Sequence, residues 1–214
     1  MPVTQPDFAR MRTAMIDSQL RPNGVTTDRI VDAFRAVPRE QFVPEKLRAF
    51  AYYDEDIEIA PGRYMMEPLT LGRLLENARP QAGERALVIG GGTGYSARLL
   101  ARLGLEVVLL EDAALMQPVE GAASIETVSG DLSAGHADGG PYDIILIEGF
   151  IERLPPEILA QAAEGGRIAT VILDEGTPRA GIGRVYGSHV GWSFFAESYI
   201  PPLAGFARTA EFTF

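Results

Sequence analysis

Two N-terminal stretches of the chain carry apolar residues every three or four positions, the spacing of amphipathic helices. This spacing predicts one helix over residues 7–20 and a second over residues 27–37, which Pro38 ends. Residues 40–60 mix aromatic and acidic side chains, a pattern that favours short helices and loops. The sequence therefore predicts a helical cap over residues 1–68.

Beyond residue 68 a further helix is expected over residues 69–78, and short apolar stretches then alternate with helical or loop segments. Strands are expected at residues 85–90, 106–111, 124–129, 143–148 and 167–173, with helices at 95–103 and 155–163. Strands joined by crossovers predict an α/β fold with a mostly parallel central sheet. Residues 192–199 and 206–214 are expected to close this sheet as antiparallel strands, whereas the glycine-rich stretch before them receives no assignment.

A glycine turn joins the first predicted strand to the helix that follows it. Gly90, Gly92 and Gly94 have the spacing G-x-G-x-G, and such a turn presents backbone N–H groups and the positive end of a helix to a ligand. A dinucleotide site would have glycine where Tyr95 stands, so the spacing better suits a nucleoside with an amino-acid tail, S-adenosylmethionine. The alternative is a turn in which glycine serves only the backbone conformation.

A carboxylate ends the second predicted strand, and another follows the third. Glu111 could accept hydrogen bonds from both ribose hydroxyls of a nucleoside, and Asp131 from its adenine amino group. Alternatively, Glu111 caps a helix and Asp131 is a surface turn residue. Three consecutive strand ends with suitable groups are stronger evidence than any one of them, so we expect a cofactor site at this edge of the sheet.

Several segments along nearly the whole chain together resemble the protein-L-isoaspartate O-methyltransferase family. The segments are Val-Pro-Arg-Glu-Gln-Phe-Val-Pro-Glu at residues 37–45, Ala-Tyr-Tyr-Asp at 51–54, the glycine turn at 90–95, and residues 130–131, 141–143, 164–167 and 199–203. The first of them is the most specific to the family. The resemblance implies a Rossmann-like, S-adenosylmethionine-dependent methyltransferase domain over residues 69–214, forming one structural unit with the cap.

The resemblance also implies a function, protein repair by methyl transfer to isoaspartyl carboxylates in damaged proteins or peptides. A carboxylate is already ionised at neutral pH, so the reaction needs no general base and no catalytic residue is assigned. The resemblance assigns cofactor contacts to Gly90, Gly92, Gly94, Glu111 and Asp131.

The sequence departs from the family in three places. The family has Thr-Ile-Ser-x-Pro where this chain has Tyr64-Met65-Met66-Glu67-Pro68, so that Met66 replaces a hydroxyl expected to handle the acceptor carboxylate. Val88 replaces an acidic residue before the glycine turn, and residues 112–123 leave room for only a short crossover. Arg63 or Tyr64 could supply the missing donor. We expect weak isoaspartyl methylation and a partial gain on Met66→Ser.

Two alternatives follow from these departures. The chain could methylate another acceptor with S-adenosylmethionine, in keeping with the altered stretch around Met66. It could also be a catalytically inactive relative that acts as a binding protein, in keeping with Val88 and the short crossover.

The composition of the chain argues against two classes of partner, nucleic acids and metal ions. The chain has 29 Asp and Glu against 19 Lys and Arg, and its net charge of −10 argues against nucleic acid as a partner. It has no cysteine and only two histidines, which argues against a metal site.

No apolar run approaches the ~20 residues that span a bilayer. No secretory signal is recognisable, so we expect a cytoplasmic protein of undetermined oligomeric state.

Overall fold

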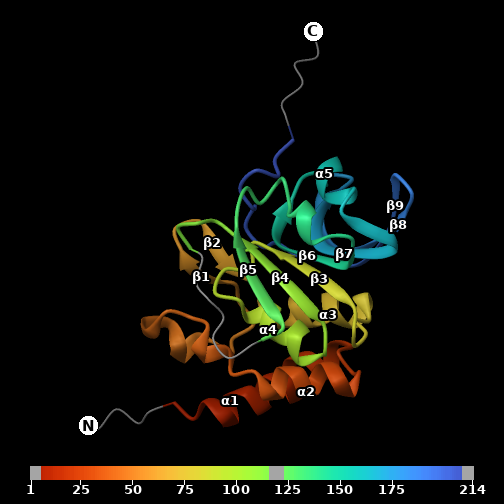
Figure 1. Cartoon of the computed structure of the whole chain (residues 1–214). Helices are drawn as coiled ribbons and strands as arrows, with labels where there is room; N and C mark the ends of the chain where they lie inside the picture. The colour runs from red at the N-terminus through yellow and green to blue at the C-terminus, as the bar shows by residue number, and fades with distance from the viewer. Residues whose placement is uncertain (1–5, 116–122, 209–214) are drawn as a thin grey trace.

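A seven-stranded sheet in the order β5-β4-β3-β6-β7-β8-β9 forms the centre of the molecule (Figure 1). The structure is a computed structural model and describes residues 6–115 and 123–208. The strands are β3 Arg85–Ile89, β4 Glu106–Glu111, β5 Ile125–Ser129, β6 Tyr142–Ile151, β7 Ala162–Asp174, β8 Thr177–Tyr186 and β9 His189–Glu197. Strands β5, β4, β3, β6 and β7 run parallel, and β8 and β9 are antiparallel. The predicted α/β fold class is confirmed.

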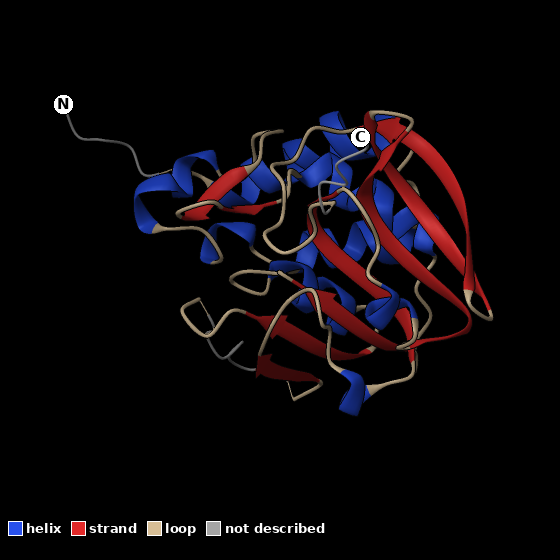
Figure 2. Ribbon diagram, turned by 90° about the horizontal axis from the view of Figure 1, so that it is seen from above, coloured by secondary structure: helices blue, strands red, loops and turns tan. Residues whose placement is uncertain are grey.

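Helices cover one face of this sheet, and the short helix α5, Pro156–Leu159, lies on the other (Figures 1 and 2). The first group comprises α1 Phe8–Met15, which continues as a π-helical turn over Ile16–Leu20, α2 Asp28–Ala36, α3 Pro68–Ala78 and α4 Tyr95–Arg102. In β3, Val88 packs toward the first group and Leu87 toward the opposite side, as expected of a strand buried on both faces.

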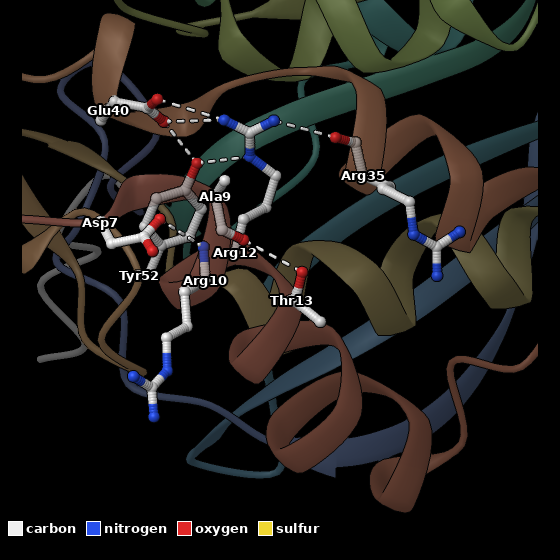
Figure 3. Close-up of polar contacts among 8 residues, drawn as sticks. All are labelled: Asp7, Ala9, Arg10, Arg12, Thr13, Arg35, Glu40 and Tyr52. Carbon is white, nitrogen blue, oxygen red and sulfur yellow. Dashed lines mark hydrogen bonds and ion pairs between the residues drawn. The ribbon is translucent and has the colours of Figure 1, made fainter.

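A charged cluster ties α1 to the rest of the N-terminal region (Figure 3). The guanidinium of Arg12 donates to the hydroxyl of Tyr52 at 2.7 Å and to the carbonyl of Arg35 at 3.0 Å, and it pairs with Glu40 at 3.1 Å. The Tyr52 hydroxyl also donates to Glu40. Because one guanidinium joins three segments that are distant in the sequence, it fixes the path of the chain from α1 to residue 52.

The N-terminal region is not entirely helical, and here the prediction was incomplete. The expected short helices are present as 3-10 turns over Arg39–Gln41 and Glu45–Phe50. They are followed by an antiparallel hairpin of β1 Ile57–Ala60 and β2 Arg63–Met65. Pro61 and Gly62, the latter at a φ of +70°, form the turn of this hairpin.

Strand β8 was not predicted, and its glycines explain why. A Cβ on Gly181 would lie 2.6 Å from the ring of Phe194, and one on Gly183 would lie 2.5 Å from Val190, both on the neighbouring strand β9. Glycine is therefore required at both positions, because the side chains of β9 fill the space that a Cβ would need. The same glycines remove the alternation of apolar and polar residues by which a strand is recognised.

The C-terminal half also differs from the prediction in its helix and its last strand. The helix expected over residues 155–163 is limited to α5, because β7 already begins at Ala162. Residues 206–208 form no strand, and 209–214 lie outside the described residues. Part of the crossover at 112–123 also lies outside them. Within the described ranges, no helix combines the length and apolar character needed to cross a membrane.

Candidate functional site

The glycine turn between β3 and α4 has a backbone that side chains other than glycine rarely adopt. The φ angles are +72° at Gly90, +56° at Gly92 and +87° at Gly94, and Gly94 directly precedes the first residue of α4. An L-residue with a Cβ is strained in this left-handed region. The three glycines therefore meet a conformational requirement of the turn, whether or not they also contact a ligand.

Glu111 ends β4 with its side chain fully buried against this turn. Its Oε2 accepts a hydrogen bond from the backbone N–H of Gly92 at 2.6 Å, and its Oε1 accepts one from the N–H of Asp112 at 2.7 Å. The structure thus brings together two of the residues that the sequence assigned to one site. It also gives Glu111 a role in holding the turn.

Arg63 of β2 is the residue that sequence analysis did not connect to Glu111. Its Nη1 and Nη2 donate to the two carboxylate oxygens of Glu111 at 2.6 and 2.9 Å, and Nη2 also donates to the carbonyl of Gly90 at 3.0 Å. The Arg63 side chain is 11% exposed. The guanidinium of Arg63, from the β1–β2 hairpin, is therefore fixed where β3 and β4 end.

Asp131 lies in the turn after β5. Its exposed carboxylate accepts hydrogen bonds from the N–H and the hydroxyl of Ser133 at 2.9 and 2.8 Å, and these bonds lower the pKa of Asp131. Arg63 and Asp131 both line a pocket of about 600 Å³. Its lining comprises Ala60, Pro61, Arg63, Asp112, Ala114, Leu115, Gly130, Asp131, Leu132, Ala204 and Gly205.

Apolar side chains cover the glycine turn beside this pocket. A Cβ placed on Gly92 would overlap the Cδ1 atom of Ile59 from β1, and one placed on Gly90 would lie 3.2 Å from both terminal methyl groups of Leu203. The space directly above Gly90 and Gly92 is thus filled by the chain itself. The open part of the site lies toward Asp131.

An acidic side chain does lie under the turn, although Val88 replaces the acid that the family has in β3. Glu148 of β6 is 3% exposed, accepts a hydrogen bond from the hydroxyl of Ser96, and would lie 3.3 Å from a Cβ on Gly91. Burial raises the pKa of Glu148 to about 7. Sequence analysis missed Glu148 because it follows the apolar run at residues 144–147 of β6 and belongs to no motif of its own.

Met66 does not face the pocket. Its side chain is fully buried in the core beneath the helices, and its carbonyl accepts a hydrogen bond from Nη2 of the buried Arg39 at 2.7 Å. Tyr64, the other suggested donor, is half-buried in β2. A substitution at Met66 therefore acts first on packing.

Comparison with known proteins identifies the family of this chain. The model of the protein-L-isoaspartate(D-aspartate) O-methyltransferase family matches residues 10–178. Two relatives, the protein-L-isoaspartate O-methyltransferases of Koribacter versatilis and Methylorubrum extorquens, are 35% and 37% identical to this chain. The alignments cover 80% and 76% of this chain and 79% and 74% of those proteins.

Two solved structures have the same fold. One, a protein-L-isoaspartate O-methyltransferase, has a TM-score of 0.77 at 24% identity, covering 91% of this chain and 66% of that one. The other, a putative enzyme of this kind from Plasmodium falciparum in complex with S-adenosyl-L-homocysteine, has a TM-score of 0.76 at 15% identity and covers 93% and 99%. The extent of the family match, together with the identity to these relatives, shows that the chain belongs to the protein-L-isoaspartate O-methyltransferase family.

Proposed function

We propose that the chain transfers a methyl group from S-adenosylmethionine to the isoaspartyl carboxylate of damaged proteins or peptides, in the cytoplasm. Its membership of the protein-L-isoaspartate O-methyltransferase family is the observation that carries this proposal. The named relatives are methyltransferases of that specificity, and the alignments span most of both chains.

The chemistry of the candidate site is in keeping with this cofactor. The carboxylate of Asp131 borders the pocket, where it can accept hydrogen bonds from an adenine amino group. Glu111, at the end of the adjacent strand, offers a carboxylate of the kind that accepts from ribose hydroxyls. The turn at Gly90, Gly92 and Gly94 would support the amino-acid tail. We assign cofactor binding to these five residues.

The proposed reaction asks little of the protein beyond binding and alignment. S-adenosylmethionine supplies an activated methyl group when bound. The acceptor is ionised at neutral pH, because a carboxyl pKa lies near ~4, and needs no base to remove a proton. The chain must therefore orient the acceptor and exclude water. It must also offset the repulsion between an acidic substrate and a protein of net charge −10.

Initial rates of methyl transfer to a matched pair of peptides test this function. The two peptides differ only in whether one residue is isoaspartyl or aspartyl. We expect methylation of the isoaspartyl peptide and none of the aspartyl peptide. Bound S-adenosylmethionine with no transfer to either peptide would favour another acceptor or an inactive relative. No cofactor binding at all would contradict the proposal itself.

A further inference from the structure

We infer that Arg63 competes with the ribose of the cofactor for Glu111, so that the β1–β2 hairpin must release Glu111 before the complete cofactor binds. This inference rests on the proposed function. It adds a residue that limits cofactor affinity and a movement that accompanies binding. Two observations support it: the carboxylate of Glu111 has no free acceptor position, and the hairpin packs directly above Gly92.

The carboxylate of Glu111 has no acceptor position left for a ribose. Each of its oxygens accepts two hydrogen bonds, Oε1 from Arg63 and the N–H of Asp112, and Oε2 from Arg63 and the N–H of Gly92. An ionised carboxylate offers about four lone-pair positions. A pair of ribose hydroxyls can therefore be accepted only if present donors leave.

Arg63 is the partner that can leave. The N–H groups of Gly92 and Asp112 are fixed by the backbone next to the sheet, whereas the guanidinium of Arg63 reaches Glu111 from a hairpin outside it. The hairpin is short, with four residues in β1 and three in β2. Withdrawing Arg63 removes the counter-ion of the buried carboxylate and leaves two acceptor positions open, which the two ribose hydroxyls can fill as hydrogen-bond donors.

The same hairpin also fills the space above the glycine turn. The Cδ1 atom of Ile59 occupies the position where a Cβ on Gly92 would lie, and Arg63 Nη2 would lie 3.2 Å from a Cβ on Gly90. A ligand that runs from Asp131 along Glu111 to the turn would thus meet Arg63 and then Ile59. Both side chains belong to one hairpin, so one displacement opens both positions.

Calorimetric titration with S-adenosylhomocysteine tests the competition without any catalytic step. Arg63→Ala removes the competing donor, and we expect it to bind about tenfold more tightly, the factor that corresponds to roughly 1.4 kcal/mol. Arg63→Lys should give an intermediate affinity. Ile59→Ala keeps the ion pair and opens the space above Gly92, so it should also bind more tightly. Ile125→Ala, a half-buried isoleucine in the edge strand β5, is the matched control and should leave affinity unchanged.

A single introduced thiol reports the movement, because the natural chain has no cysteine. In Ile59→Cys the thiol should react slowly with a disulfide reagent in the free protein, where the side chain packs on Gly92. It should react faster at saturating S-adenosylhomocysteine. Ser188→Cys, in the exposed turn between β8 and β9, should react at one rate in both conditions.

The outcomes separate this inference from the proposed function. Tighter binding in Arg63→Ala, together with a faster thiol reaction of Ile59→Cys in the presence of ligand, supports the competition. If the natural chain binds the ligand but Arg63→Ala does not gain affinity, or the thiol of Ile59→Cys reacts at the same rate with and without ligand, the competition is refuted and the function stands. If the natural chain itself binds no ligand, the proposed function is refuted and the competition with it. Should Arg63→Ala fail to fold, the affinity of Arg63→Lys and the thiol reaction of Ile59→Cys still decide.

Discussion

Arg63 and Glu111, 48 positions apart in the sequence, form an ion pair through both carboxylate oxygens at 2.6 and 2.9 Å. Removing one partner of a buried pair typically costs about 3–5 kcal/mol, because the other charge is left without a counter-ion. Glu111→Gln should therefore lower the free energy of unfolding by about 3 kcal/mol. Urea denaturation measures this change.

The matched control for this variant is Glu106→Gln, at the exposed start of the same strand. It should change the free energy of unfolding by less than about 0.5 kcal/mol, as surface substitutions usually do. Equal effects at Glu106 and Glu111 would mean that the ion pair with Arg63 contributes nothing specific to stability.

Asp131→Asn should affect ligand binding and leave the fold intact. Asp131 is exposed and its hydrogen bonds are local, to Ser133, so the free energy of unfolding should change by about 0.5 kcal/mol or less. An asparagine offers one acceptor oxygen in place of two and carries no charge, so S-adenosylhomocysteine should bind more weakly by calorimetry. Undiminished affinity would place the adenine away from Asp131.

Met66→Ser should destabilise the protein without creating a donor in the pocket. The Met66 side chain is fully buried, and truncating a buried methionine costs about 2–5 kcal/mol through lost burial and a cavity. This expectation replaces the gain in isoaspartyl methylation that the sequence predicted for the same variant. Met66→Leu conserves volume and should cost less than about 1.5 kcal/mol. A serine variant as stable as the leucine variant in urea would contradict this placement.

Glu148 should make stability depend on pH near neutrality. Burial raises the pKa of Glu148 to about 7 from an ordinary value of 4.5, while Ser96 and Arg39 act in the opposite direction. Between these two values the folded protein holds a proton that the unfolded chain has released, so this contribution to stability falls as pH rises. It is complete below about pH 4.5 and lost above about pH 7.

Glu148→Gln removes this titration and should flatten the pH dependence. At pH 8 the variant should be more stable than the natural chain by a few kcal/mol, because one pKa unit corresponds to about 1.4 kcal/mol. The two chains should differ least at pH 4.5. Urea denaturation at both pH values measures the difference, and parallel curves for the two proteins would contradict it.

Sequence patterns predicted the parallel part of the fold because each element there has a local signature. Val88 and its neighbours in β3 form an apolar run followed by glycine, and α4 has an apolar stripe. Strand β8 escaped prediction because Gly181 and Gly183 meet a requirement of the adjacent strand. That requirement becomes visible only when the pairing with β9 is known.

Sequence patterns likewise related some residues of the candidate site to one another and missed others. Glu111 and Asp131 were predicted as cofactor contacts because the carboxyl ends of parallel strands meet at one edge of a sheet. The partner of Glu111 was not, because no local pattern relates residue 63 to residue 111. Glu148 was missed for the same reason, since its effect on the glycine turn depends on the pairing of β3 with β6.

The most direct test of the account is calorimetric titration of S-adenosylmethionine into the natural chain and into Gly92→Val. The natural chain should bind one molecule per chain. The variant should lose binding, because valine is strained at a φ of +56° and its side chain would clash with Cδ1 of Ile59, which distorts the turn that holds the cofactor. Circular dichroism should show that the variant remains folded. A natural chain that gives no binding heat, or a folded Gly92→Val that binds equally well, would contradict the assignment of this turn to the cofactor.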